Sequence, residues 1–214
     1  MNKFYSSLKN RKYFLNKSDE CNFSPPYWRV NCTSTFRFVL LLISLLLSTE
    51  ISFAQSSINY TFTTNTTGSL ALDANGNSVD MTTGSTQLVG PLSDATASAV
   101  NNIGFNYYFM GNLYTQFSAN ADGILGLGAS AVSGTSVSGG SATTPKISAL
   151  GADLYVSASG KVHYKIIGTA PNRCLVVEWT GMAVTYNTTA ANGNSQWQVR
   201  LYESSGVVEY IYGA

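Results

Sequence analysis

The chain has 214 residues, of which 44% are hydrophobic and only 11% are charged, and its formal net charge is +1. Soluble domains usually carry about 25% charged residues, so a low-charge chain of this length fits one domain, or one and a half, of the secreted β-protein type. Residues 55–214 hold eight acidic and five basic residues, a balance of −3. That part therefore lacks the positive charge that nucleic-acid binding requires.

The N-terminal region has the pattern of an export signal. Residues 1–37 hold seven Lys or Arg and two acidic residues, and residues 38–47 read FVLLLISLLL. This apolar core is shorter than the ~18 residues of a membrane span and is typical of a secretory signal peptide. The small residues that follow predict cleavage between Ala54 and Gln55, so that residues 1–54 form a basic, disordered leader with a signal peptide. The alternative is an uncleaved segment that anchors the chain in the membrane.

The predicted elements after the leader are strands. Residues 58–63 (INYTFT) alternate and predict a first strand, whereas residues 64–99 predict long loops with one or two weak strands. Apolar side chains then share one face in IGFNYYFMGNLYTQFSANADGILGLG, residues 103–128, with turn signals at Gly111-Asn112 and at 120–123. This stretch predicts a three-strand meander.

The second half of the chain continues in the same way. Residues 129–144 (ASAVSGTSVSGGSATT) predict an exposed, flexible loop. Turns are predicted at 157–160 and at 204–206. The further predicted strands are 146–156, 161–167, 173–179, 195–203 and 207–212.

Together these elements predict an all-β fold. No segment after residue 54 shows sustained helical periodicity, and many short strands at this spacing are typical of a two-sheet antiparallel sandwich or a jelly roll. The last strand has no protecting tail, so we expect the module at 55–214 to be truncated at its C-terminal end and to be part of a longer protein. The residues predicted for the core are Phe105, Phe109, Tyr164, Val177, Trp179, Trp197 and Leu201.

The order of four motifs resembles a known module. The meander is followed by PKISALGADLY, GKVHYKIIGTAPNRCLVVEW and QWQVRLYESSGVVEYIYG. The series resembles the β-sandwich module at the N-terminus of secreted Bacteroidetes proteins, which often end in a type IX secretion sorting domain. It is also distantly similar to the extracellular nidogen-type domain. The resemblance covers residues 103–213 and implies no catalytic residues. The chain departs from it at 150–153, where relatives have aromatic and paired acidic residues, and at Asp122-Gly123, where they have Asn-Gly.

No catalytic residues are predicted from the sequence. His163 is the only histidine and shares a strand face with Lys161 and Lys165, so we expect it on a solvated face, which excludes a Ser-His-Asp triad. Cys174 lies in the strand-like run RCLVVEW. We expect it to be a buried thiol that acts as a small hydrophobic side chain.

The acidic residues are candidates for hydrolysis or for cation binding. Glycoside hydrolysis would need a pair from Asp122, Asp153, Glu178, Glu203 and Glu209. We expect Glu178 to point outward and Glu203 and Glu209 to flank a hairpin turn, so no such pair is predicted. Asp122 and Asp153 are the candidate calcium ligands, because calcium takes carboxylates from loops. The alternative is that Asp122 only forms a turn with the following glycine.

The expected function is a secreted or cell-surface, non-catalytic module for adhesion, surface display or interaction within a larger exported protein. The alternative is a carbohydrate-binding module of a degradative enzyme, in which Tyr108, Tyr202, Tyr210 and Tyr212 would stack on sugars; cross-strand packing also explains these residues. The expected partners are glycans or other surface proteins, and calcium is the one cofactor considered. We expect binding in the loops at 64–99 and 129–144.

Overall fold

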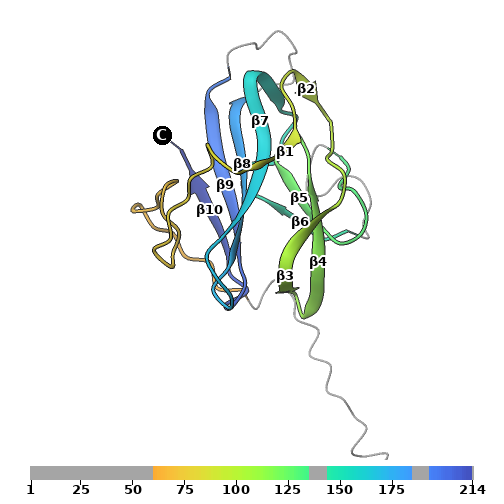
Figure 1. The fold of residues 1–214 in the computed structure, drawn as a ribbon. Coiled ribbons are helices and arrows are strands. Elements are labelled where there is room, and N and C mark those ends of the chain that lie inside the picture. Colours follow the sequence, from red (N-terminus) through yellow and green to blue (C-terminus); the bar gives the residue numbers. More distant parts are fainter. Residues whose placement is uncertain (1–59, 135–143, 185–192, 214) are drawn as a thin grey trace, which may run out of the picture. The chain divides into compact units, whose positions relative to one another are not determined.

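The computed structural model describes residues 60–134, 144–184 and 193–213, all of which belong to one compact unit, Ala54–Ala214. These residues form two antiparallel sheets and no helix, as the alternating pattern predicts (Figure 1). In the described residues no helix has the length and apolar character to cross a membrane. The predicted cleavage site at Ala54 and Gln55 lies outside them.

The four-stranded sheet is the predicted meander with one short strand added, in the order β3-β4-β5-β6. Its strands are β3 (Asn101–Phe109), β4 (Asn112–Ala119), β5 (Ile124–Leu127) and β6 (Lys146–Ser148). Ile103, Phe105 and Tyr107 are buried while the residues between them are exposed, so the alternation predicted their face correctly. The first turn lies one residue earlier than predicted, because Met110 and Gly111 both have positive φ, 50° and 77°. This pair of values is typical of a tight hairpin turn.

The larger sheet has six strands in the order β1-β7-β8-β9-β10, and β2 pairs beside β1 on β7. The strands are β1 (Thr86–Val89), β2 (Ser93–Asp94), β7 (Tyr155–Ile167), β8 (Cys174–Ala183), β9 (Ser195–Tyr202) and β10 (Val208–Tyr212). Two short strands in 64–99 and the C-terminal hairpin of β9 and β10 confirm the prediction.

The sequence prediction was wrong for residues 146–160. The predicted strand 146–156 is interrupted after β6, and the predicted turn at 157–160 lies inside β7, which continues through a bulge. Gly160 of β7 and Gly181 of β8 meet at the bulge, where a Cβ on Gly181 would lie only 2.7 Å from the Cα of Gly160. Two glycines therefore allow the backbones to approach, and the strand continues where the sequence suggests a turn.

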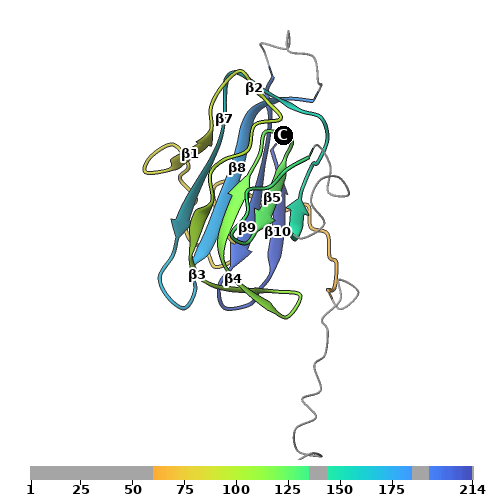
Figure 2. The same ribbon diagram turned by 90° about the vertical axis from the view of Figure 1, so that its right-hand side faces the viewer.

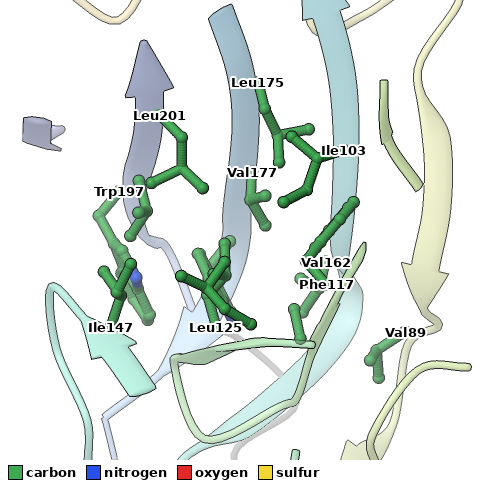
Figure 3. Packing of buried hydrophobic residues seen from close by; sticks show 14 of the residues in the cluster. Val89, Ile103, Phe117, Leu125, Ile147, Val162, Leu175, Val177, Trp197 and Leu201 are labelled. Atoms are coloured by element: carbon green, nitrogen blue, oxygen red, sulfur yellow. The ribbon is translucent and has the colours of Figure 1, made fainter. Parts of the chain in front are cut away.

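The core lies between the two sheets (Figures 2 and 3). Trp179 of β8 and Trp197 of β9 stack with their ring centroids 5.9 Å apart. Phe117 of β4 packs edge-on against Tyr164 of β7, which joins the sheets. Of the seven predicted core residues, Phe109 and Tyr164 are partly buried and the other five are buried.

The first predicted strand does not form in the described part of its range. Residues 60–63 belong to no strand. Tyr60 instead packs against Phe109, and its hydroxyl accepts a hydrogen bond from the Met110 amide. Tyr60 therefore attaches the segment to the β3–β4 turn by an aromatic contact and a hydrogen bond, and not by sheet pairing.

Residues 69–85, which we call the strap, cross the outer face of the six-stranded sheet, on the side away from the four-stranded sheet (Figure 1). Val79 and Met81 of the strap are buried against side chains of β7, β8 and β9. The outer members of this second cluster are Ile167, Cys174, Val176 and Tyr202. The larger sheet is thus buried on both faces, which explains the unbroken apolar run CLVV in β8.

The predicted loop at 129–144 is only partly described, since residues 135–143 lie outside the described residues. Its first part is not simply exposed. Val132 is buried, packs beside Gly126, and its amide donates a hydrogen bond to Ser118 Oγ. Val132 is therefore anchored in the packed structure, whereas residues 129–131, 133 and 134 are exposed, as predicted.

Candidate functional site

Three carboxylates meet at one end of the sandwich. Asp94 ends β2, Asp122 lies in the turn between β4 and β5, and Asp153 lies in the connection between β6 and β7. One carboxylate oxygen from each lies within 4.8 Å of the others. Among the described residues this is the one group of three or more His, Cys, Asp or Glu side chains with the spacing of a metal site. The structure thus brings the two sequence candidates together and adds Asp94.

The local sequence NADG, Asn120 to Gly123, fixes the central carboxylate. Asn120 Oδ1 accepts a hydrogen bond from the Ile124 amide, and its backbone carbonyl accepts one from Trp179 Nε1 at 2.8 Å. Gly123 has a φ of 75°, and a Cβ there would collide with the Leu150 carbonyl. Asp-Gly is therefore a turn, as predicted, but it is a buried turn tied to the core.

Asp122 is only 1% exposed, while Asp94 and Asp153 are exposed. Its oxygens accept hydrogen bonds from the Leu154 amide at 3.2 Å and, at 3.4 Å, from Asn120 Nδ2. The pKa of Asp122 is raised from 3.8 to about 6, mainly by burial and in addition by the nearby charges of Asp153 and Asp94, while the hydrogen bond from the Leu154 amide acts in the opposite direction. At neutral pH the fold therefore holds a carboxylate whose charge is poorly compensated by protein groups.

The chemistry of this group suits a hard cation. Calcium binds oxygen ligands, including carboxylates and carbonyls supplied by loops. Asp94, Asp122 and Asp153 would supply three such carboxylates, two of them accessible to solvent. A divalent cation would compensate the buried charge of Asp122 directly. The three carboxylates are therefore ligands of the type that calcium takes.

The prediction for His163 was wrong. His163 is on the outer face of β7, opposite Val162, but it is 2% exposed rather than solvated. Its Nε2 lies 2.8 Å from Glu178 Oε1, and its Nδ1 lies 2.9 Å from Ser85 Oγ in the strap. Glu178 is likewise outward on β8 but buried beneath the strap. The solvated face that the alternation suggested is an internal polar layer.

This Ser85–His163–Glu178 row has the residue types of a catalytic triad but not its setting. Ser85 Oγ lies 3.0 Å from the Met81 carbonyl and 2.9 Å from His163 Nδ1, and the tautomer of His163 decides which of the two accepts its proton. His163 and Glu178 are only 2% and 4% exposed, whereas the histidine of a catalytic triad must also reach a bound substrate to protonate its leaving group. The row therefore links the strap to the sheet.

Glu178 is held as a carboxylate in this layer. Burial by itself raises the pKa of Glu178, but hydrogen bonds from His163, Gln198 and Gln196 outweigh it and keep the pKa below its usual value. Gln198 Nε2 lies 2.7 Å from Glu178 Oε2 and also donates to the Leu70 carbonyl of the strap. The carboxylate is thus an acceptor for donors on both neighbouring strands.

Arg200 of β9 is the second attachment of the strap and is fully buried. Its guanidinium donates to the carbonyls of Ser69, Leu70 and Leu72 at 2.7 to 3.2 Å. It also donates to Gln198 Oε1 and to Glu209 of β10. The guanidinium is planar and has five N–H donors, so it can bind several carbonyls of the strap at once, and these carbonyls are not paired in a sheet.

The remaining candidates have structural partners. Cys174 is buried, as predicted, and burial raises the pKa of its thiol to about 12, so it is unreactive at neutral pH. Glu203 pairs with Arg173, and Glu209 accepts hydrogen bonds from Tyr202 Oη and Arg200. Of the five acidic candidates, the structure brings together Asp122 and Asp153, in the three-carboxylate group described above.

A family model described as NIDO related matches residues 59–214. The chain belongs to the NIDO-related family. This match confirms the similarity to nidogen-type domains and extends it toward the N-terminus, because it begins at residue 59 rather than 103. The strap and Asp94 therefore belong to the NIDO-related module itself. Searches against curated proteins and against solved structures found no match.

Two parts of the NIDO-related module escaped the sequence analysis. Asp94 lies in a Ser-, Thr- and Ala-rich stretch, and only its pairing with Tyr155 brings it near Asp153. The composition of the strap predicted only loops, although Cys174 and Val176 of β8 indicated that the outer face of this strand is covered. Their outward side chains are apolar and alternate with Leu175 and Val177, so that both faces of this strand had to be covered.

Proposed function

We propose that this NIDO-related module is a secreted or cell-surface, non-catalytic unit with a role in adhesion, surface display or interaction within a larger exported protein. The family match supports an extracellular-type module. We also propose that the larger protein is a Bacteroidetes protein exported by type IX secretion, because the four sequence motifs occur in the same order as in those proteins. The N-terminal leader supports export.

The observation that carries the non-catalytic part is the use of the polar side chains. His163, Glu178 and Arg200 are buried beneath the strap and each has at least two hydrogen-bond partners. Their partners are strap atoms and neighbouring strands. The hydrogen bonds of these side chains stabilise the fold. Contacts with other molecules are therefore expected at the exposed loops and edges of the module.

The carbohydrate-binding alternative receives less support from the aromatic residues. Tyr202 is 3% exposed and Tyr210 is half-buried, so two of the four candidate tyrosines are not available for stacking. Tyr108 and Tyr212 are exposed but lie on different sheets. A flat sugar-binding platform would need several exposed aromatic rings on one surface.

Purified residues 54–214 test the proposal on a glycan array and on a panel of ester, glycoside and peptide substrates. We expect no turnover above the level of the Ser85→Ala variant, which removes the hydroxyl of the triad-like row. Hydrolysis that disappears with Ser85→Ala would establish an enzyme and overturn the proposal. Selective glycan binding would favour the carbohydrate-binding alternative.

Export is tested on the full chain in a secreting host. We expect the secreted product to begin at Gln55, which N-terminal mass spectrometry measures. A product that keeps residues 1–54, or that stays inside the cell, would contradict the extracellular assignment.

A further inference from the structure

The side chains that attach the strap to the sheet differ in how they respond to pH. Arg200 and Lys165 donate hydrogen bonds to carbonyls of the strap, and guanidinium and ammonium groups ordinarily keep their charge between about pH 5 and pH 8. His163 contacts Ser85 at the C-terminal end of the strap, and histidine is the side chain whose charge ordinarily changes in that range. The number of hydrogens in this contact therefore decides how firmly that end of the strap is held.

Glu178 determines the position of the first hydrogen on His163. Glu178 is ionised, and a carboxylate accepts hydrogen bonds but has no proton to donate. Its Oε1 lies 2.8 Å from His163 Nε2, so the hydrogen between these two atoms belongs to Nε2. Its other oxygen accepts from Gln198 and Gln196 at 2.7 and 3.0 Å. A neutral His163 therefore carries no hydrogen on Nδ1, which is then an acceptor.

Ser85 cannot serve both of its partners when His163 is neutral. Its Oγ lies 2.9 Å from His163 Nδ1 and 3.0 Å from the Met81 carbonyl, and both of these atoms are then acceptors. A hydroxyl has one hydrogen to donate, so one of the two contacts holds two acceptors with no hydrogen between them. His163 and Met81 are 2% and 5% exposed. Water therefore has little access to the acceptor that lacks a donor, and such an acceptor weakens the attachment.

A second proton on His163 satisfies the whole row. Nδ1 then donates to Ser85 Oγ, and the hydroxyl hydrogen of Ser85 goes to the Met81 carbonyl. Nε2 donates to Glu178 as before, so each short contact contains one hydrogen. The imidazolium also compensates the charge of Glu178, which is only 4% exposed. Both the hydrogen bonds and the buried charge therefore favour the protonated form while the strap is in place.

Other charged side chains act on His163 more weakly than Glu178 does. Within the described residues those on the surrounding elements are Lys161 and Lys165 of β7 itself, Arg200 of β9 and Asp80 of the strap, while β1 places the neutral Gln87 opposite His163. Lys161 and Lys165 oppose a positive charge on His163, but both are half-exposed, and solvent screens their charges more than it screens a buried pair. Arg200 donates to Gln198 and Glu209, and Asp80 accepts hydrogen bonds from two threonines. Glu178 is the charged group in contact with the imidazole.

We propose that docking of the strap is linked to protonation of His163, so that the strap is held most firmly near pH 5 and opens more often as the pH rises toward 8. The sign follows from the proton count, because the docked strap favours the form of His163 with one more proton, and opening therefore becomes easier as protons are removed. An open strap uncovers the outer face of the six-stranded sheet. There Cys174 and Val176 lose their contacts with Val79 and Met81 of the strap.

Cys174 provides the measurement, because it is the one cysteine in residues 54–214 and is buried in the cluster that the strap covers. Residues 54–214 form one compact unit with their own core. Reaction of the thiol with dithiodipyridine is followed by absorbance from pH 5 to pH 8. Dividing the rate in urea by the native rate at each pH gives a protection factor that is free of the reagent's own pH dependence. The variants are His163→Gln, Ser85→Ala and, as the control, Asp122→Asn, which removes a carboxyl that titrates in the same range but does not contact the strap.

We expect the protection factor of the wild type and of Asp122→Asn to be at least about fivefold higher at pH 5 than at pH 8, the effect of one hydrogen bond. In His163→Gln and Ser85→Ala the ratio should fall below about twofold. A wild type with equal protection at both pH values overturns the proposal. A pH dependence that persists in His163→Gln, or that disappears in Asp122→Asn, also overturns it.

The wild type alone decides the question if His163→Gln or Ser85→Ala does not fold. His163 is the single histidine of the chain, so nitrogen NMR of the imidazole reports on this residue without assignment. We expect hydrogens on both ring nitrogens at pH 5 and on Nε2 alone at pH 8. A neutral ring with its hydrogen on Nδ1, or a ring that gains no proton by pH 5, contradicts the proposal.

Discussion

Replacing Asp122 by Asn should stabilise the module at neutral pH. Asp122 is buried, and its pKa of about 6 in the fold compares with 3.8 in the unfolded chain. A difference of about two pKa units, at 1.36 kcal/mol per unit, corresponds to about 3 kcal/mol. The amide side chain of the variant would keep an oxygen for the Leu154 amide and would place N–H donors near Asp94 and Asp153, so it should recover most of this free energy.

The sign of the pH dependence follows from the raised pKa. Between pH 3.8 and 6 the folded protein binds more protons at Asp122 than the unfolded chain does, so the free energy of unfolding decreases as pH rises through this window. Below pH 3.8 the carboxyl is neutral in both states and the penalty is absent. The variant and the wild type should therefore differ little at pH 3.5 and by up to about 3 kcal/mol at pH 7.5.

Urea denaturation followed by the fluorescence of Trp179 and Trp197, in buffer with EDTA, measures this difference. Asp94→Asn is the control, because it removes an exposed carboxylate from the same group and should change the free energy of unfolding by less than about 0.5 kcal/mol. A variant less stable than the wild type at pH 7.5 would refute the reasoning. Millimolar calcium in place of EDTA should stabilise the wild type and not Asp122→Asn if the three carboxylates share a cation; equal responses would exclude that site.

Three further changes test the scaffold. Gly123→Val should lower the free energy of unfolding by about 3 kcal/mol or more, because φ is 75° and the new Cβ would collide with the Leu150 carbonyl. The control Gly76→Ala, at a φ of 80° with no atom within 4 Å of the new Cβ, should lower it by only about 1 kcal/mol. Thermal melts compare the two variants, and equal losses would contradict the close approach described for Gly123. Trp179→Phe should lower the free energy of unfolding more than Trp197→Phe does, because of these two indoles only Trp179 has a hydrogen-bond acceptor for its Nε1, the Asn120 carbonyl. Chemical denaturation compares the two variants, and the reverse order would argue against this hydrogen bond. Arg200→Met should speed proteolytic cleavage within residues 69–85, because the carbonyls of Ser69 and Leu72 lose their donor and that of Leu70 keeps only Gln198. Arg173→Met, which breaks a more exposed ion pair, should not speed cleavage, and an unchanged rate for Arg200→Met would mean that the strap does not depend on Arg200.

Local alternation was enough to predict the inner surfaces of the sandwich. In β3 and β9 every second residue is large and apolar, and these side chains are the ones that face the core. The turns at Asp122-Gly123 and at 204–206 could be placed because Gly, Asp and Ser favour turn conformations. Pattern and turn chemistry act over a few residues, and that range is sufficient for these elements.

What local patterns could not give was the second covering layer. His163 and Glu178 alternate with apolar residues, so they have the pattern of a half-exposed strand, and only the strap, about 80 residues earlier, makes them buried. The third carboxylate depends in the same way on the pairing of β2 with β7. In both cases the deciding contact joins distant segments of polar composition, in which periodicity has no signal.

The attachment of the strap also implies an order of folding. Its carbonyls at Ser69, Leu70 and Leu72 find their donor on Arg200, 128 to 131 positions later in the chain. During synthesis from the N-terminus, this segment emerges among the first parts of the module but can dock only when β9 has been made and paired. Its Ser-, Asn- and Gly-rich sequence remains soluble while the segment is exposed to solvent before β9 is synthesised, whereas a hydrophobic strand at this position would tend to aggregate during that time. The polar composition of the strap, which gives no periodic pattern in the sequence, thus also keeps the segment soluble until β9 has formed.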